Sequence, residues 1–375
     1  MRWFAKRAGD ASARPALVRS VTGVAGGEWP RSYEAQVRDA YLANPVAQRA
    51  VRIVAEGAAE VPVYPVADSA GGRRAAGLIA APGLVETVGA HLLLHGNAFV
   101  QIVGDAEGVP AELFALRPDR VTIEQDARGW PAGYLYRAGD CVTRLGAADG
   151  AGRPAVAHLR ALNPLDDLYG VGSLGAAAGA VAVHNAAARW NKALLDNAAR
   201  PSGALVYDPG EAGAALSAEQ FDRLRREMEA GFAGPGNAGR PMLLEGGLKW
   251  QAMSLTPADM DFAELKAGAA RDIALAFGVP PMLLGLPGDN TYANLTEANR
   301  ALWRLTIVPL AGRIVGGIGA ALKAWWPEAA LALDLDAVPA LASDRAALWA
   351  QAGAADFLSV DEKRAMLGFA PVGQA

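Results

Sequence analysis

The sequence has few of the residues from which catalytic and metal sites are usually built. It contains one cysteine, Cys141, and four histidines among 375 residues. A single cysteine excludes a disulfide within the chain and a zinc site made of cysteines, and it fits a reducing compartment such as the cytoplasm. Arg2, Lys6 and Arg7 open the chain with no apolar run behind them, so a secretory signal is not expected.

The chain also lacks a strong excess of charge of either sign. Its 35 Lys and Arg residues stand against 39 Asp and Glu residues, which gives a formal net charge of −4. Proteins that hold nucleic acid electrostatically are usually strongly basic, so tight binding of nucleic acid is not expected. With 52% hydrophobic residues, however, the chain has ample material for a core, and its length predicts two or three substructures.

A glycine pattern suggests one possible enzymatic function. The segment Gly170-Val-Gly-Ser-Leu-Gly175 matches the spacing of dinucleotide-binding turns and opens a predicted helix, where backbone amides could hold a phosphate. The strand before it ends near Leu159, so the tight strand-to-helix turn of such sites is missing. We therefore favour helix capping by Ser173 and close packing at the glycines, and keep a nucleotide-binding soluble enzyme as the alternative interpretation.

Two further pairs of polar residues have spacings that active sites use. His91 and His95 share one helix face, as zinc ligands could, but no third ligand cluster accompanies them, and we expect partly buried, hydrogen-bonded histidines. Asp334 and Asp336 alternate in a predicted strand and share a face, so an acid–base pair and carboxylates at a loop edge or subunit contact both stay open. We expect no catalytic residues, no metal and no cofactor.

The first 160 residues are predicted to form an α+β unit with a small antiparallel sheet. Helices are expected at 44–59 and 84–94, and Gly71-Gly72-Arg73-Arg74 indicates a turn. Strand-like runs occur at 61–66, 98–103, 120–125 and 134–137.

The middle of the chain begins with a long helix over 173–199, whose first half is almost entirely Ala, Gly and Val. Small residues on every side let several helices crowd together, which suggests packing against neighbouring copies. A compact α/β insert then follows, and Ser217 with Gln220 makes a capping box at the start of its helix. The elements of the insert are strands at 203–207, 242–244 and 248–254 and a helix at 217–232.

The segment 259–326 is predicted to form two helices joined by a mobile loop. An apolar stripe marks the first helix, which ends at Gly278, and turn-forming residues fill 284–294. Thr296 can cap the second helix, and Pro309 should kink it. The chain then closes with a strand at 331–335 and helices at 344–352 and 360–367.

The stretch 306–326 is apolar enough to resemble a membrane span. Arg313 near its middle and Pro309 near its start argue against a span. Its glycines at 312, 316, 317 and 319 are instead expected to let another helix approach closely.

The order of these elements and four local motifs resemble those of the portal proteins of tailed bacteriophages, of the siphophage type. Gene transfer agents carry portal proteins of the same type. The resemblance covers nearly the whole chain. The motifs are Tyr169-Gly-Val-Gly-Ser-Leu174, Leu243-Leu-Glu-Gly-Gly-Leu-Lys-Trp250, Asp272-Ile-Ala-Leu-Ala-Phe-Gly-Val-Pro-Pro-Met-Leu-Leu-Gly285 and Ala293-Asn-Leu-Thr-Glu297.

The resemblance implies a non-enzymatic protein that forms a dodecameric ring at one capsid vertex. Double-stranded DNA would be packaged and ejected through its channel without sequence specificity. The ring would dock the terminase large subunit and the head–tail adaptor. It would contact the major capsid protein of the surrounding shell and would not contact a membrane. Its location would be the virion or gene transfer agent particle, assembled in the host cytoplasm.

The resemblance also implies an α+β portal fold with named regions. These are a flexible N-terminal arm at 1–30, an α/β wing at 31–168, a first stem helix at 169–200, a small α/β clip at 201–258, a second stem helix at 259–280, a tunnel loop at 281–294, a long kinked wing helix with a closing strand at 295–340, and a short helical crown at 341–375.

The expected site residues follow from these regions. The tunnel loop near DNA would present Leu286, Pro287, Gly288, Asp289, Asn290, Thr291 and Tyr292. Packing between the stems of neighbouring copies would use Ala176, Ala177, Ala180, Val183, Phe262, Leu265 and Ile273. Contact of the clip with motor and adaptor would use Tyr207, Glu219, Arg223, Glu227, Lys249 and Trp250.

Overall fold

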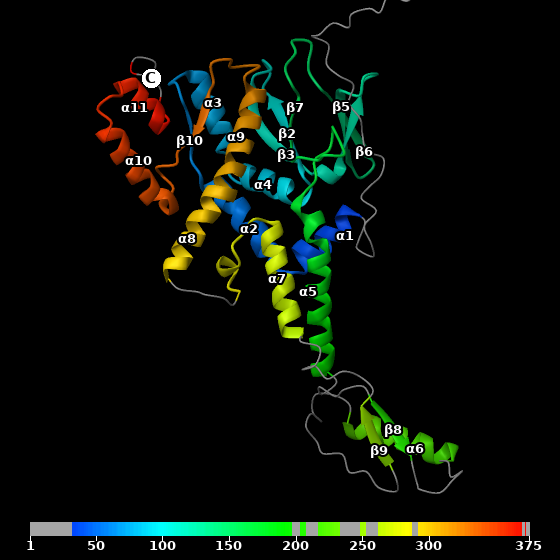
Figure 1. The fold of residues 1–375 in the computed structure, drawn as a ribbon. Coiled ribbons are helices and arrows are strands. Elements are labelled where there is room, and N and C mark those ends of the chain that lie inside the picture. The colour runs from blue at the N-terminus through cyan, green and yellow to red at the C-terminus, as the bar shows by residue number, and fades with distance from the viewer. Residues whose placement is uncertain are drawn as a thin grey trace, which may run out of the picture. The chain divides into compact units, whose positions relative to one another are not determined.

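The computed structural model describes residues 32–196, 203–207, 217–232, 248–252, 262–286, 292–369 and 372, so the expected arm at 1–30 and the strand at 242–244 lie outside the described residues. The chain divides into two compact units (Figure 1). The first comprises Met1–Ala178 and Ile273–Ala375, and the second comprises Gly179–Asp272.

The first unit begins with helices that surround its core. The predicted helix at 44–59 is confirmed as α2, which starts at Pro45 because Asn44 Oδ1 accepts from the amides of Val46 and Ala47, both at 3.0 Å. Its buried face of small and β-branched residues packs against α4. The helical elements here are α1 (Tyr33–Val37), a π-helical turn (Arg38–Leu42), α2 (Pro45–Glu60), α3 (Ala70–Ile79) and α4 (Leu84–Leu94).

The turn expected at Gly71-Gly72-Arg73-Arg74 is wrong, because these residues lie in α3. Ser69 caps this helix by accepting from Gly72 N at 2.9 Å. The two glycines are needed for packing rather than for a turn. A Cβ on Gly71 would lie 2.6 Å from the Trp326 ring, and one on Gly72 would lie 2.8 Å from Pro65 Cβ.

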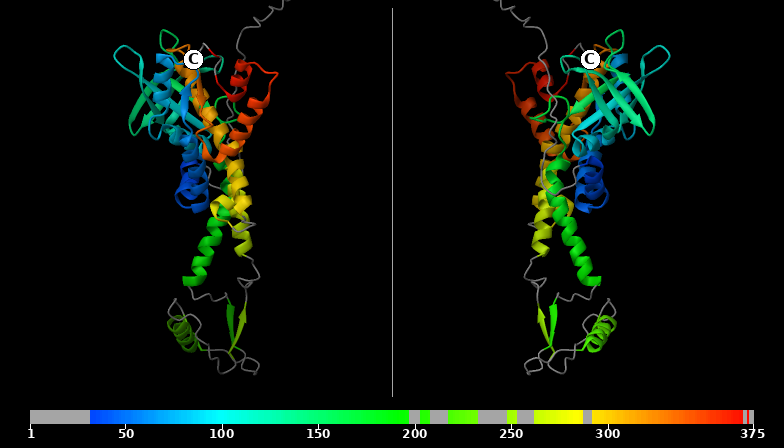
Figure 2. Two further views of the ribbon diagram at one scale, coloured as in Figure 1. Left: turned by 90° about the vertical axis from the view of Figure 1, so that its left-hand side faces the viewer. Right: turned by 90° about the vertical axis from the view of Figure 1, so that its right-hand side faces the viewer.

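Two antiparallel three-stranded sheets, ordered β3-β2-β7 and β4-β5-β6, form the rest of the core. Phe99, Leu116, Val121, Ile123 and Tyr134 belong to one buried cluster that both sheets share. Figure 2 shows the sheets on one side of the first unit, away from α10 and α11. The strands are β2 (Asn97–Gly104), β3 (Pro110–Leu116), β4 (Val121–Gln125), β5 (Pro131–Ala138), β6 (Cys141–Gly146) and β7 (Val156–Arg160), of which β3 and β6 were not expected from the sequence.

A 30-residue helix, Ala293–Leu322, crosses the first unit. It comprises α8 (Tyr292–Leu302) without its first residue, a π-helical turn (Trp303–Ile307) and α9 (Val308–Leu322). The capping role expected of Thr296 is wrong, because α8 already begins at Tyr292. Pro309 is the second residue of α9, and the wide π-helical turn ends directly before α9 begins. Proline has no N–H to donate, so the α-helical hydrogen bonding is interrupted in this turn.

This helix is, by itself, the one described helix that is long and apolar enough to cross a membrane; α3 and α4, bent by 59°, pass only as a pair. Leu310, Ile314, Ile318 and Leu322 of α9 are buried in the subunit core, as expected of a core helix.

Gly312, Gly317 and Gly319 of α9 face side chains of strands rather than another helix, and a Cβ on Gly316 would meet nothing within 4 Å, which corrects the expectation. A Cβ on Gly317 would lie 2.9 Å from the Leu159 side chain of β7, and one on Gly319 would lie 3.5 Å from Leu331 of β10 (Leu331–Leu333). β10 pairs with β1 (Val63–Pro65). The close approach of two helices occurs instead at Gly57 of α2, whose Cβ would lie 2.7 Å from Ile307.

The C-terminal helices α10 (Ala342–Ala354) and α11 (Val360–Leu367) confirm the two helices predicted there. α11 begins with a full capping box, in which Ser359 accepts from Glu362 N and Glu362 accepts from Ser359 N.

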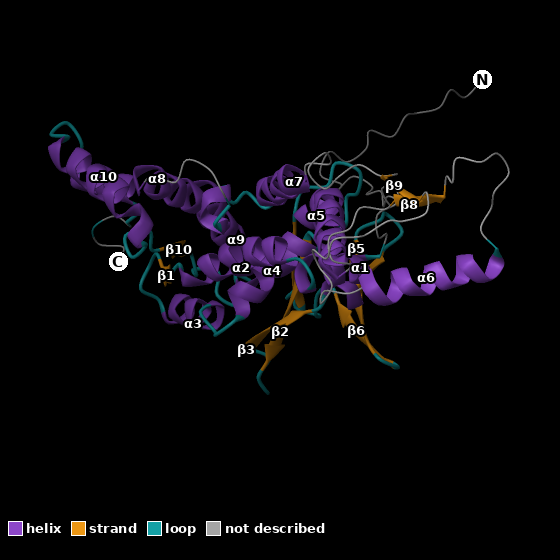
Figure 3. Cartoon of the chain, turned by 90° about the horizontal axis from the view of Figure 1, so that it is seen from below, coloured by secondary structure: helices purple, strands orange, loops and turns teal. Residues whose placement is uncertain are grey.

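The second unit holds a helix pair and a small α/β module. The helices are α5 (Ser173–Asp196) and α7 (Phe262–Ala276), which both continue into the first unit and lie side by side when seen from below (Figure 3). The module has β8 (Gly203–Tyr207) paired with β9 (Leu248–Ala252), and α6 (Ala218–Phe232). The predicted capping box is confirmed: Ser217 Oγ accepts from Gln220 N, and Gln220 Oε1 accepts from Ser217 N.

Candidate functional site

The glycine turn at 170–175 is packed against backbone. A Cβ on Gly170 would lie 2.2 Å from Gly96 O, and one on Gly172 would lie 2.6 Å from Leu94 O. The amide of Gly170 already donates to Asn97 Oδ1 at 2.8 Å. The expected close packing is therefore confirmed at these two glycines, and the first amide that a phosphate would need is engaged. Capping by Ser173, the first residue of α5, stays a prediction.

Asn97 holds this turn, and its importance was not recognised from the sequence. Its side chain is fully buried, and its amide nitrogen donates to Gly170 O at 3.1 Å. His158 Nε2 lies 3.1 Å from Asn97 Oδ1, and His95 Nδ1 lies 3.1 Å from the amide nitrogen. The sequence does carry a signal for this role: Asn97 directly follows Gly96 and begins an apolar strand. A polar side chain in a buried strand needs hydrogen-bond partners.

His91, His95 and His158 are half-buried, as expected, and a lowered pKa favours the neutral form of each. Burial lowers the pKa of His158 to about 4, with Arg160 and His95 adding to the effect. Burial likewise lowers the pKa of His91 to about 4. Hydrogen bonding is as expected for His95, but His91 Nδ1 is buried without a partner, since no described polar group reaches it. Among the described residues, no group of three or more His, Cys, Asp or Glu could hold a metal.

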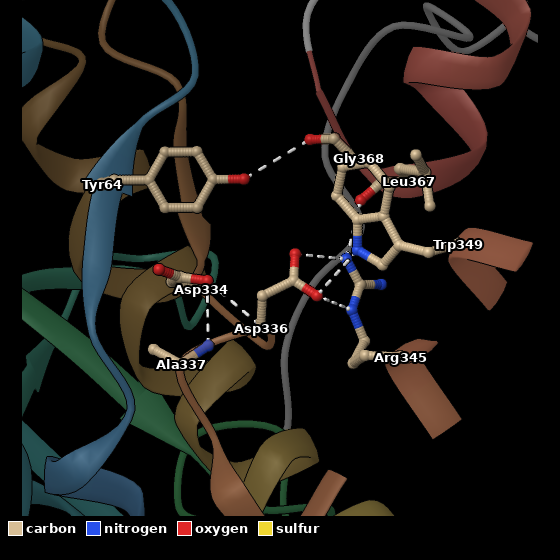
Figure 4. A network of polar contacts seen from close by, with 8 residues as sticks. All are labelled: Tyr64, Asp334, Asp336, Ala337, Arg345, Trp349, Leu367 and Gly368. Atoms are coloured by element: carbon tan, nitrogen blue, oxygen red, sulfur yellow. Dashed lines mark hydrogen bonds and ion pairs between the residues drawn. The ribbon is translucent and has the colours of Figure 1, made fainter. Parts of the chain in front are cut away.

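Asp334 and Asp336 lie after the end of β10, in a turn, and have separate structural roles. Asp334 Oδ1 accepts from the amides of Asp336 and Ala337, at 3.1 and 3.3 Å. Asp336 accepts from Arg345 Nε at 2.6 Å and from Nη2 at 2.8 Å (Figure 4). The hydrogen bonds from Arg345 lower the pKa of Asp336, which keeps its carboxylate charged. The acid–base interpretation is therefore wrong, because each carboxylate is occupied by its own partners.

The same network fastens the C-terminal helices. Arg345 Nη2 also donates to Leu367 O at 3.1 Å, and the hydroxyl of Tyr64 donates to Gly368 O at 3.4 Å (Figure 4). Trp349 Nε1 donates to Asp336 Oδ1 at 3.2 Å. Strand β1, the turn after β10 and the end of α11 are thus joined by side-chain hydrogen bonds.

The expected stem residues fall into two groups. Ala177 and Ile273 are buried within the chain, so their side chains pack inside the subunit. Ala176 and Leu265 are exposed, and Ala180 and Val183 are half-buried. The side chain of Phe262 lies outside the described residues.

The helix pair also contains a buried histidine. His184 of α5 is buried, and burial together with Lys266 of α7 lowers its pKa.

The expected clip and tunnel-loop residues are only partly described. Glu219, Arg223 and Lys249 are exposed, whereas the side chains of Tyr207, Glu227 and Trp250 lie outside the described residues. Residues 287–291 of the loop also lie outside them. The expected loop at 281–294 is too wide, because a 3₁₀ turn occupies Pro281–Leu284 and α8 begins at Tyr292. Leu286 is half-buried, and its amide donates to Pro281 O at 3.3 Å.

Comparison with known proteins places this architecture in a family. Residues 45–368 match the family model described as phage portal protein. The chain is 39% identical over 350 residues to an uncharacterized protein of Rickettsia bellii (strain RML369-C), covering 88% of each chain. It is 28% identical over 222 residues to the probable portal protein of Streptomyces phage phiC31, covering 58% of this chain and 48% of that protein.

Solved structures show the same likeness. A chain in the virion of a native gene transfer agent particle is 45% identical, with a TM-score of 0.67, covering 92% of this chain and 95% of that chain. An HK97-family phage portal protein from Corynebacterium diphtheriae shares the fold at 19% identity and a TM-score of 0.52, covering 80% of this chain and 98% of that chain. Because the family model covers most of its length, this protein belongs to the phage portal protein family.

Proposed function

We propose that this chain forms a ring of twelve copies at one vertex of a phage capsid or gene transfer agent particle. One observation carries the proposal: the chain is 45% identical, over 92% of its length, to a chain in the neck of a native gene transfer agent particle computed with C12 symmetry. A related neck of an empty particle was computed with C6 symmetry, which is compatible because six divides twelve. A heterologous contact that repeats around an axis and closes produces such a ring.

The axis of this ring would be the path of double-stranded DNA during packaging and release. The charge of the chain supports sliding, because its net charge is −4 and the loop 286–292 contains Asp289 but no Lys or Arg. Each Lys or Arg contact to a phosphate releases counterions and adds affinity, which would slow a moving strand. The loop would instead contact DNA by shape.

The likeness to portal proteins also suggests which elements of this chain would form each region of the portal. The first unit would hold the wing and the short crown, and α5 with α7 would form the stem. Exposed Ala176 and Leu265 would contact neighbouring copies, whereas buried Ala177 and Ile273 would support the helices from inside. The module of β8, β9 and α6 would be the clip, where exposed Glu219, Arg223 and Lys249 would meet the terminase motor and the adaptor.

The proposed role requires no catalysis by this chain. Portal proteins form a structural rather than a catalytic family, and ATP hydrolysis would belong to the terminase. The alternative of a nucleotide-binding enzyme loses its support, because Gly170 and Gly172 are packed against backbone.

The function is tested in a strain that lacks the chain. Particles from that strain should contain no nuclease-protected DNA, and the wild-type chain supplied in trans should restore it. DNA-filled, tailed particles produced without the chain would contradict the proposal.

A further inference from the structure

The outer edge of β6 is open for pairing with another strand. β6 is the last strand of the sheet β4-β5-β6, and it pairs with β5 alone. The amide of Ala147, directly after β6, donates to Ala132 O at 3.2 Å. Because bonded and non-bonded pairs alternate along an antiparallel ladder, the N–H and C=O of Val142 and Arg144 point away from β5. Within the described part of the chain, no hydrogen bond reaches these groups.

The opposite edge of the same sheet is covered, whereas β6 lacks the usual protection of an edge. On β4, the outward amide of Ile123 donates to the hydroxyl of Tyr169 at 2.8 Å. β6 contains no Lys and no Pro and pairs with β5 without a bulge, which are the devices that commonly block an edge. The side chain of Arg144 bonds to Glu124 of β4 at 2.6 Å, so its charge lies across the sheet. An edge of this kind can take up an additional strand.

The side chains along this edge also leave room for a further strand. Val142 is 50% exposed, and Thr143 is exposed although it lies on the face of the sheet that is turned to the core. Leu145 and Tyr136 pack against the buried cluster but are themselves only half-buried. A strand added beside β6 would cover this rim of the core and remove apolar surface from water.

The chain before Ser32 contains one segment with the composition of a strand. Residues 16–24 read Ala-Leu-Val-Arg-Ser-Val-Thr-Gly-Val, and they lie outside the described residues. Val18, Val21, Thr22 and Val24 are β-branched, and the segment contains no proline and no acidic residue. This composition favours an extended strand.

The chain enters the described structure close to this sheet. Ser32 caps α1 by accepting from Ala35 N at 3.2 Å, and Tyr33 follows it. The pKa of Arg117 is raised mainly by its hydrogen bond to Asp119, and Tyr33 of α1 and Tyr136 of β5 both add to the effect. The start of α1 and strand β5 therefore lie near the same guanidinium group. Figures 1 and 3 show α1 on the same side of the first unit as β5 and β6.

The length of the connection permits pairing within one chain. Eight peptide units separate positions 24 and 32, and eight extended residues span up to about 28 Å. A segment tethered at this range has an effective concentration on the order of millimolar at the neighbouring sheet. The tether therefore favours the arm of the same chain over the arm of another copy.

We propose that residues 16–24 pair with the outer edge of β6 in the same chain and extend the sheet β4-β5-β6 to four strands. The added strand would bond to the outward backbone groups of Val142 and Arg144. It would also close an edge through which separate subunits could otherwise pair with one another. The inference does not depend on the proposed ring.

The first test measures amide hydrogen exchange of the full chain, with fragmentation that resolves single residues of β6. Val21→Pro and Thr22→Pro each remove one N–H of the segment. Because successive N–H groups of a strand point to opposite sides, one of the two variants must lose an N–H that faces β6. Ala8→Pro, in the same arm but outside residues 16–24, is the matched control.

The amides of Val142 and Arg144 should exchange slowly in the wild type and in Ala8→Pro. In at least one of Val21→Pro and Thr22→Pro, they should exchange about tenfold faster, because the bonds from the added strand are lost. Thermal unfolding should stay unchanged in all three variants. Equally fast exchange of these two amides in the wild type and in both proline variants would overturn the inference.

The second test uses Cys141, which is the single cysteine of the chain and is exposed on β6. In Ser20→Cys, a short bismaleimide reagent should join the new thiol to Cys141 within one chain. In the control Ala5→Cys, crosslinking should be about tenfold slower or more, because position 5 lies outside the pairing segment. Peptide mass spectrometry identifies the joined residues.

A mixture of two chains distinguishes pairing within a chain from exchange between copies. One chain carries Ser20→Cys with Cys141→Ser, and the other is the wild type, so a crosslink to Cys141 can form only between chains. This mixture should give no such crosslink. Crosslinks between chains, or none within a chain in Ser20→Cys, would overturn the inference. Neither result depends on whether rings form, so failure of this inference and failure of the proposed function are distinguishable.

Discussion

Asp336 and Arg345 form a two-bonded ion pair that joins the turn after β10 to α10. Their carboxylate and guanidinium atoms are 2.6 and 2.8 Å apart, and Arg345 also donates to Leu367 O at the end of α11. One side chain therefore links three segments of the chain.

Replacing Arg345 should loosen the C-terminal helices. In Arg345→Met, the loss of charge-assisted bonds should cost about 1 to 2 kcal/mol locally, because Asp336 keeps its charge but loses its main partner. Amide hydrogen exchange in α10 and α11 should speed up by about five- to thirtyfold. Arg313→Met, on the exposed face of α9, is the control and should leave exchange unchanged. Equal exchange in both variants would show that the pair does not hold these helices.

Two glycines three residues apart should respond oppositely to alanine. Gly172→Ala places a Cβ 2.6 Å from Leu94 O and should destabilise the protein by about 2 kcal/mol or more. In Gly175→Ala, the added Cβ would have no neighbouring atom within 4 Å, so the change should stabilise the protein by about 0.5 to 1 kcal/mol. Urea unfolding midpoints measure both. Similar tolerance at the two positions would contradict the packing explanation for this turn.

Asn97→Ala should be among the more damaging polar substitutions. It leaves the N–H and C=O of Gly170 without their side-chain partner in a partly buried position, and each such group costs about 1 to 3 kcal/mol. Thr122→Ala, at an exposed position of β4, should cost less than about 0.5 kcal/mol. Thermal unfolding compares the two variants. A small effect of Asn97→Ala would mean that the turn at Gly170 does not depend on the hydrogen bonds of the Asn97 side chain.

Acid should destabilise the first unit through its half-buried histidines. The pKa of His91 and of His158 is about 4 in the folded chain, below the ordinary value of 6.5. The unfolded state therefore binds more protons between pH 6.5 and 4, and stability falls as pH falls through this window. His91→Leu removes one of the two groups and should make the decline in melting temperature less steep. An unchanged slope would exclude His91 as a source.

The tunnel loop should tolerate no added positive charge. In Asp289→Lys, a phosphate-binding cation would face moving DNA, so packaged, nuclease-protected DNA per particle should fall while rings form normally. Asp289→Asn removes the charge without adding a cation and should package close to normally. Normal packaging by Asp289→Lys would contradict the proposal that this loop approaches DNA.

The sequence predicted elements that depend on local signals. Pro45 after Asn44, the capping box at Ser217 and the stop at Gly278 are local signals of this kind, and the corresponding helices are present. The family resemblance supplied the fold class, because periodicity alone does not specify how helices and strands assemble.

Long-range packing explains what the sequence did not predict. Gly71 and Gly72 were expected to form a turn, but they lie in a helix, where the close approach of Trp326 and Pro65 leaves no room for a Cβ. The glycines of α9 were expected to face a helix, yet Leu159 of a strand lies against Gly317. The buried side chains of Ala177 and Ile273 likewise follow from tertiary packing, which residue spacing does not reveal.

The most direct test of the account is the mass of the purified wild-type chain in solution, measured by light scattering and accompanied by negative-stain images of the same fraction. One species of twelve subunits that appears as a ring with a central hole is expected. A chain that remains monomeric or forms closed dimers at every concentration would contradict it.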